Sequence, residues 1–103
     1  MNKEFADRLR AHLWKEFNGY NSLRFVRTGL GKKVGHSIRI CCLSSKAHDI
    51  KVYMGNVFGL HRCKTSPYIE TLGANLRNYT KLFWDDITQE ELDCIDTLLR
   101  MRG

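Results

Sequence analysis

The stretch His48–Cys63, HDIKVYMGNVFGLHRC, decides the predicted fold. Ile50, Val52 and Met54 occupy alternate positions, which is the period of a strand buried on one side. Gly55-Asn56 follows, and this pair tolerates the positive φ angles of a two-residue hairpin turn. The stretch therefore predicts a β-hairpin that is closed by these two residues.

The two faces of this predicted hairpin differ in chemistry. One face is apolar and ends in a group of histidine and cysteine side chains. The other face is aromatic and cationic, and its members are Lys51, Tyr53, Phe58 and Arg62, with Arg39 on the neighbouring predicted strand. Such a surface suits the stacking of unpaired bases, whereas a helix packed against it would make the same aromatic residues part of the core.

The first third of the chain predicts a helix and two strands. An apolar residue at every fourth position over 2–17 is typical of an amphipathic helix. The runs 22–30 and 36–43 are rich in strand-forming residues and predict two strands. The glycine-rich loop between them carries Lys32 and Lys33. Free backbone amides beside two ammonium groups suit a phosphate contact, and a loop whose lysines only face water is the alternative.

The last third of the chain predicts two helices. Ser66-Pro67 fits the N-cap and the first position of a helix, and apolar residues at helical spacing continue over 66–83. Thr88 and Glu91 have the spacing of a capping box, which predicts a final helix over 88–101.

Together these elements predict one α+β domain over residues 1–103. The expected architecture is an antiparallel meander sheet of about four strands with an N-terminal helix and two C-terminal helices. The four cysteines lack the setting of a secreted disulfide framework, so we expect free thiols. The sequence shows neither an export signal nor an apolar run of membrane-spanning length, and we therefore expect a cytoplasmic protein.

The net charge of +6 is unevenly distributed along the chain. Residues 1–84 hold fifteen of the 17 Lys and Arg residues, whereas residues 85–103 hold six of the 11 Asp and Glu residues. A basic body attracts phosphates or an acidic protein surface, and solubility alone is the alternative explanation. Trp14, at the edge of the first apolar stripe, is a candidate anchor for a partner, although a tryptophan at that position also completes a core.

Metal binding is the sharpest chemical alternative. Two thiols and two imidazoles suit tetrahedral zinc. The predicted hairpin would place His48, His61 and Cys63 on one face, and Cys42 could join them from the neighbouring strand. The chain lacks a Cys-x-x-Cys motif, however, and the same side chains also fit a core. A Cys/His nucleophile would need an orienting carboxylate that the hairpin register does not supply. We therefore expect a protein that is not an enzyme and holds no cofactor.

Two functions fit a small basic protein of this kind. The first is binding of nucleic acid, with a preference for single strands, through Lys32, Lys33, Arg39, Lys51, Tyr53, Phe58 and Arg62. The second is inhibition or adaptation of a large host nucleic-acid enzyme, such as a nuclease or a defence complex, by docking on an acidic patch. Trp14 is a candidate binding residue for the second function, in which the partner is a protein. In size and charge the chain is similar to small proteins that phages encode for that purpose, which is an analogy only.

Overall fold

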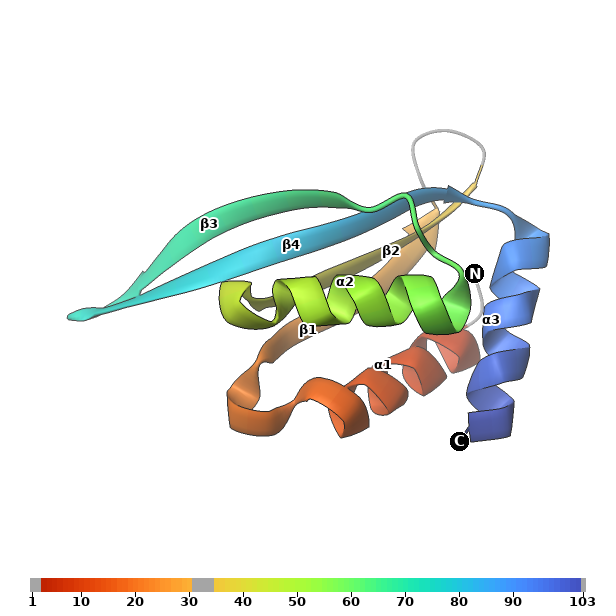
Figure 1. Cartoon of the computed structure of the whole chain (residues 1–103), viewed down its shortest axis with the longest axis horizontal. Helices are drawn as coiled ribbons and strands as arrows, with labels where there is room; N and C mark the ends of the chain where they lie inside the picture. Colours follow the sequence, from red (N-terminus) through yellow and green to blue (C-terminus); the bar gives the residue numbers. More distant parts are fainter. Residues whose placement is uncertain (1–2, 31–34, 103) are drawn as a thin grey trace.

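The computed structural model describes residues 3–30 and 35–102. Within these residues it contains three α-helices and one antiparallel sheet with the strand order β1-β2-β4-β3 (Figure 1). The elements in chain order are α1 (Lys3–Phe17), a short 3-10 turn η1 (Gly19–Asn21), β1 (Leu23–Leu30), β2 (His36–Leu43), α2 (Ser44–Phe58), β3 (Lys64–Leu72), β4 (Asn75–Ile87) and α3 (Gln89–Arg102). The predicted α+β class and antiparallel sheet are confirmed.

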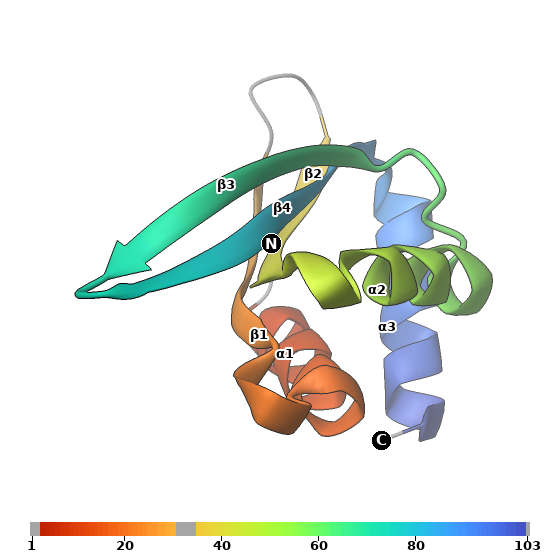
Figure 2. The same ribbon diagram turned by 60° about the vertical axis from the view of Figure 1, so that its left-hand side comes forward.

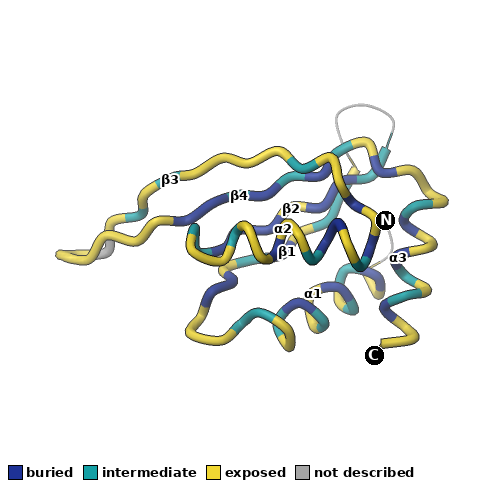
Figure 3. Tube along the Cα trace, in the orientation of Figure 1, coloured by how far each residue is buried: buried dark blue, intermediate teal, exposed yellow. Residues whose placement is uncertain are grey.

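The three described helices lie on the same side of the sheet, which leaves its other face uncovered (Figures 1 and 2). The core fills the space between the two layers, and the buried positions recur along the strands and helices that enclose it (Figure 3). The sheet contributes Val26, Ile38, Ile40, Leu82 and Trp84 to this core. The helices contribute Phe5, Leu9, Leu13, Ile50, Met54, Phe58, Leu92, Ile95 and Leu99.

The first helix, the first two strands and the last helix form as predicted. The capping box at the start of α3 is present, because the Glu91 backbone N–H donates to Thr88 Oγ1 and the Thr88 backbone N–H donates to Glu91 Oε1, each at 3.1 Å. The loop that carries Lys32 and Lys33 lies outside the described residues. No helix in the described part of the chain is long and apolar enough to cross a membrane.

The predicted hairpin over 48–63 is wrong, because residues 48–58, which include its first strand and its turn, belong to helix α2. The apolar residues Ile50, Met54 and Phe58 recur every fourth position and are all buried, which is the helical solution for the same sequence. Val52, which the hairpin would place in the core, is 42% exposed. The stop signal is Gly59, whose φ of 73° ends the helix in a left-handed cap.

The predicted helix over 66–83 is also wrong, since this segment forms the hairpin β3–β4. Two residues, Gly73 and Ala74, connect Leu72 to its partner Asn75. Gly73 has a φ of 61°, and a glycine at the first of two loop positions is typical of a type II′ turn. The order of elements therefore differs from the prediction, with one helix between the second and third strands.

This order changes the topology of the sheet. Strand β2 pairs with β4 rather than with β3, so the sheet is not a simple meander. Helix α2 carries the chain from β2 across the sheet to the edge strand β3 and packs against β2 and β4 on the way.

The edge strand β3 contains Pro67, which pairs with Thr80 in the register of the sheet. In a two-residue hairpin the residues that flank the loop form a hydrogen-bonded pair, and such pairs alternate along the ladder with non-hydrogen-bonded pairs. Pro67 is an odd number of residues from Leu72, so it belongs to a non-hydrogen-bonded pair and its ring nitrogen lies at the free edge.

Mutation can distinguish the predicted hairpin turn at Gly55-Asn56 from the observed end of helix α2 at Gly59. We expect Gly59→Ala to lower the free energy of unfolding by about 1 kcal/mol, because alanine is strained at a positive φ. A methyl group added at this position would have no heavy atom within 4 Å apart from its own chain neighbours, so the effect is confined to the backbone. Asn56→Ala is the matched control: on an exposed helical position it should be neutral or stabilising by up to about 0.5 kcal/mol.

Urea unfolding followed by circular dichroism measures both variants. A loss of more than about 1 kcal/mol in Asn56→Ala, with Gly59→Ala unaffected, would contradict helix α2 and restore the hairpin turn at Gly55-Asn56.

Candidate functional site

The uncovered face of the sheet gathers aromatic and cationic side chains. Residues on a strand alternate between the two faces, so the neighbours of the core residues point away from the helices. We use the name open face for the aromatic, cationic and thiol side chains gathered there, which are Arg24, Phe25, Arg27, Arg39, Cys41, Lys64, Tyr68, Tyr79, Lys81 and Phe83. The register places the acidic Glu70 on the same side of the sheet, next to Tyr68 along β3. Every strand of the described sheet contributes to the open face.

The cations of the open face lie over its aromatic rings. The guanidinium carbons of Arg27 and Arg39 lie 4.6 Å and 5.2 Å from the ring centroids of Phe25 and Phe83, respectively. Two further pairs of this kind are Arg24 with Tyr79 at 5.5 Å and Lys81 with Tyr68 at 5.1 Å. Each such contact stabilises the cation over the ring by about 0.5–1 kcal/mol at an exposed site. The four pairs hold the charged groups against the sheet.

The register of the sheet arranges these groups in rows. Arg27, Arg39, Phe83 and Lys64 are consecutive partners across the four strands. Arg27, Arg39 and Lys64 are exposed, whereas the ring of Phe83 is half-buried between the last two. Rows on one face repeat every two residues, which corresponds to about 6.8 Å along a strand. One row of the open face therefore presents three positive charges around one ring.

The centre of the open face is packed rather than hollow. The rings of Tyr68 and Tyr79 stack with centroids 5.7 Å apart, and the Tyr68 hydroxyl lies 3.0 Å from Cys41 Sγ. Burial, followed by the contact with Cys41, raises the pKa of Tyr68 above its usual value. Tyr68 is therefore a neutral phenol at physiological pH. Glu70 forms an ion pair with Arg24 at the margin of this cluster.

Of the predicted binding residues, Arg39 lies on the open face. Lys51 lies on α2, on the helical side of the sheet, where it is exposed. Tyr53 and Phe58 do not form a platform for bases, because α2 packs them against α1. The Tyr53 ring lies 5.0 Å from Phe17 in an edge-on contact, and Phe58 is only 7% exposed.

The remaining predicted binding residues do not join Arg39 either. Arg62 lies in the connection between α2 and β3, where its Nη2 is 3.6 Å from Glu91 Oε1. Trp14 is half-buried and packs against the core. It therefore helps to complete the core, which is the alternative to a role as an anchor for a partner. Lys32 and Lys33 lie outside the described residues, and their predicted contact with phosphate stays a prediction.

The candidate zinc ligands do not converge. His48 is exposed on α2 and His61 follows that helix, so the shared strand face that would have aligned them with Cys63 does not exist. Among the described residues no group of three or more histidine, cysteine, aspartate or glutamate side chains could hold a metal ion. Cys42 is fully buried, and its Sγ contacts the Thr80 carbonyl oxygen at 3.7 Å. Burial, and then the neighbouring Cys41 and Cys63, raises the pKa of Cys42 to about 12.

The sequence carried a signal for the open face in β4. Tyr79, Lys81 and Phe83 alternate with Thr80, Leu82 and Trp84. This alternation of an aromatic–cationic set with a mostly apolar set is typical of a strand covered on one side. The apolar residues before Tyr79 have helical spacing, and for this reason the sequence predicts a helix over 66–83 instead of a strand.

No family model, curated protein or solved structure matches this chain. A proposal for the function therefore rests on the chemistry of the open face. Exposed guanidinium groups beside half-buried rings can bind phosphate oxygens and stack on planar groups.

The thiols provide a test of this description of the site. We expect Cys94, which is exposed, to react with iodoacetamide at pH 8, whereas Cys42 stays unmodified in the folded protein. Its pKa of about 12 leaves roughly one molecule in ten thousand as the reactive thiolate at pH 8, and its burial blocks access. Mass spectrometry of the digested protein identifies the modified cysteine. Labelling in guanidinium chloride is the control that all thiols are reactive, and native labelling of Cys42 at the rate of Cys94 would contradict the structure.

Proposed function

We propose that the protein is a non-enzymatic binding module for single-stranded nucleic acid and that the open face is its binding surface. The observation that supports this most directly is the set of four cation–ring pairs on the one sheet face that no described helix covers. These pairs combine the two groups that sequence-tolerant binding of single strands requires, which are cations for the backbone and planar groups for the bases.

The cations account for attraction to the backbone. Arg27, Arg39 and Lys64 are exposed in one row, and five positive side chains in all belong to the open face. Neutralisation of phosphates by Lys and Arg releases counterions, so this part of the affinity falls steeply with salt.

The rings account for a preference for unpaired bases. Phe25 and Phe83 are half-buried in the sheet, so their orientation is fixed before a ligand arrives. A base can stack on such a ring, or on the guanidinium plane that lies over it, only if it is not already stacked and paired in a duplex. The open face therefore favours single strands over double-stranded DNA.

A charge-matched pair of double variants tests the proposal. Arg27→Ala/Arg39→Ala removes two cations of the open face, whereas Lys46→Ala/Lys51→Ala removes two exposed cations of α2 on the helical side. Fluorescence anisotropy with a labelled fifteen-nucleotide oligothymidylate, at several salt concentrations, measures the affinity of each.

We expect the open-face variant to bind at least about tenfold more weakly, equivalent to about 1.4 kcal/mol. The slope of log K against log salt should fall in magnitude by about 1.4, which is about 0.7 for each lost phosphate contact with a single strand. The α2 variant should keep the wild-type affinity within about twofold, because both of its substitutions lie on α2, which is on the other side of the sheet from the open face.

Three outcomes contradict the proposal. Equal weakening by the two double variants would indicate attraction by net charge without a defined surface. Tighter binding to a duplex than to the oligothymidylate would remove the role of the rings. Absence of oligonucleotide binding, together with a stoichiometric protein that survives nuclease treatment in an affinity purification, would favour the inhibitor or adaptor instead.

A further inference from the structure

A second charged feature lies in the helical layer, away from the open face. A cleft of about 420 Å³ opens between α1 and α3. Its α1 wall includes Arg8, His12 and Lys15, and its α3 wall includes Arg100 and Arg102. A volume of this size lies within the range of small-molecule sites.

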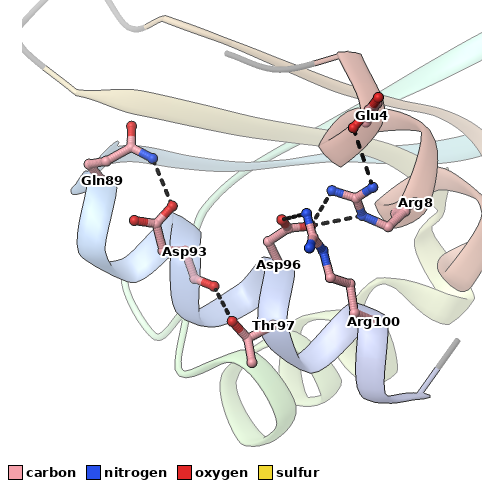
Figure 4. A network of polar contacts seen from close by, with 7 residues as sticks. All are labelled: Glu4, Arg8, Gln89, Asp93, Asp96, Thr97 and Arg100. Atoms are coloured by element: carbon pink, nitrogen blue, oxygen red, sulfur yellow. Dashed lines mark hydrogen bonds and ion pairs between the residues drawn. The ribbon is translucent and has the colours of Figure 1, made fainter.

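One side of the cleft is fixed by ion pairs (Figure 4). Asp96 lies between two arginines, with Oδ1 2.7 Å from Arg8 Nη2 and Oδ2 3.2 Å from Arg100 Nη2. Glu4 lies 3.9 Å from Arg8 on the far side of the same guanidinium. These carboxylates offset part of the arginine charge and restrict the positions of both guanidinium groups.

The other side of the cleft carries two cations that lie outside the ion pairs of the described residues. Lys15 and Arg102 form no ion pair with another residue in the described ranges 3–30 and 35–102. Both act on His12: burial lowers the pKa of this imidazole most, Glu16 raises it, and Arg102 and then Lys15 lower it by smaller amounts. His12 therefore lies within the field of a cation from each wall and of the opposing Glu16 carboxylate, and its ring is hydrogen-bonded to the Tyr53 hydroxyl.

The remaining lining of the cleft is apolar. Ala11 and Leu99 contribute methyl groups between the charged side chains. Leu99 is only 3% exposed, so the apolar surface that an inorganic anion would leave in contact with water is mainly the exposed Ala11 methyl and the alkyl stems of Lys15 and Arg102. A ligand with a charged end and a small apolar body satisfies both the cations and this apolar surface.

We propose that this cleft is a binding site for a small organic phosphate monoester. The monoester carries a charge of about −1.5 to −2 at pH 7, which suits Lys15 and Arg102, and its oxygens suit the guanidinium groups that Asp96 holds in place. Its apolar body lies against Ala11 and the alkyl stems of Lys15 and Arg102. The site is separate from the open face and does not depend on the function proposed for that surface.

Titration of the ¹⁵N-labelled protein with phenyl phosphate tests the proposal by NMR. We expect saturable shifts that centre on the amides of Ala11, His12 and Leu99. Benzoate, which has a similar body but a single negative charge, should bind about tenfold more weakly, and so should inorganic phosphate, which has no body. Phenol, which has no anionic group at pH 7, should produce no saturable shift at these positions.

Variants locate the site. Lys15→Ala/Arg102→Ala should weaken phenyl phosphate by at least about tenfold, whereas the charge-matched Lys46→Ala/Lys51→Ala variant should retain wild-type affinity within about twofold. Arg27→Ala/Arg39→Ala should also retain it, which separates this proposal from the one for the open face. Circular dichroism establishes that each variant is folded.

The proposal is overturned if phenyl phosphate shows no saturation below about 10 mM, or if its shifts centre on the open face around Phe83. It is also overturned if Lys15→Ala/Arg102→Ala and Lys46→Ala/Lys51→Ala lose affinity equally, because the cations of the cleft would then act only through net charge. Equal binding of benzoate would exclude selection of a dianion, and equal binding of inorganic phosphate would exclude a role for the apolar lining.

Discussion

The structure depends on the burial of one face of a twisted antiparallel sheet under a single layer of helices. Trp84 links the sheet to the chain that follows α2, because its indole is 1% exposed and its Nε1 donates to the Leu60 carbonyl oxygen at 3.1 Å. That bond satisfies a polar group that burial would otherwise leave unpaired, and it fixes the chain between α2 and β3 against the sheet. Since every described helix is used on this side, the opposite face is left to the chemistry of its own side chains.

The sequence alone predicts the elements whose local signals agree. Helix α1, strands β1 and β2 and helix α3 combine a clear period with a start or stop residue, such as the Thr88–Glu91 capping box. Residues 44–58 carry two competing periods, since Ile50, Val52 and Met54 suit a strand while Ile50, Met54 and Phe58 suit a helix. Only tertiary packing decides between them, because the exposure of Val52 costs less than breaking the contacts of the helical stripe.

The candidate site shows a different relation between sequence and structure. The sequence predicts a sheet face with aromatic and cationic side chains from composition and alternation. The structure contains such a face at another place in the chain. Among the predicted binding residues that the structure describes, Arg39 lies on it. Tyr53 and Phe58 pack against α1 because residues 44–58 form the helix α2, and on the uncovered sheet face β4 supplies Lys81 and Phe83. The kind of chemistry was therefore more predictable than its location, because location depends on strand order, which β2–β4 pairing sets across a long connection. The cleft between α1 and α3 joins residues from the two ends of the chain, and no local pattern indicates it.

The position of Pro67 has a consequence for how far the sheet can extend. An exposed edge strand presents a row of donors and acceptors on which a strand from another molecule can pair. The ring nitrogen of Pro67 removes one donor from the middle of that row on β3. A neighbouring copy therefore cannot continue the ladder along the whole edge, and lateral growth of the sheet into a fibre is disfavoured. At the β3 edge, the uncovered surface is therefore not widened by an uninterrupted ladder to a second copy.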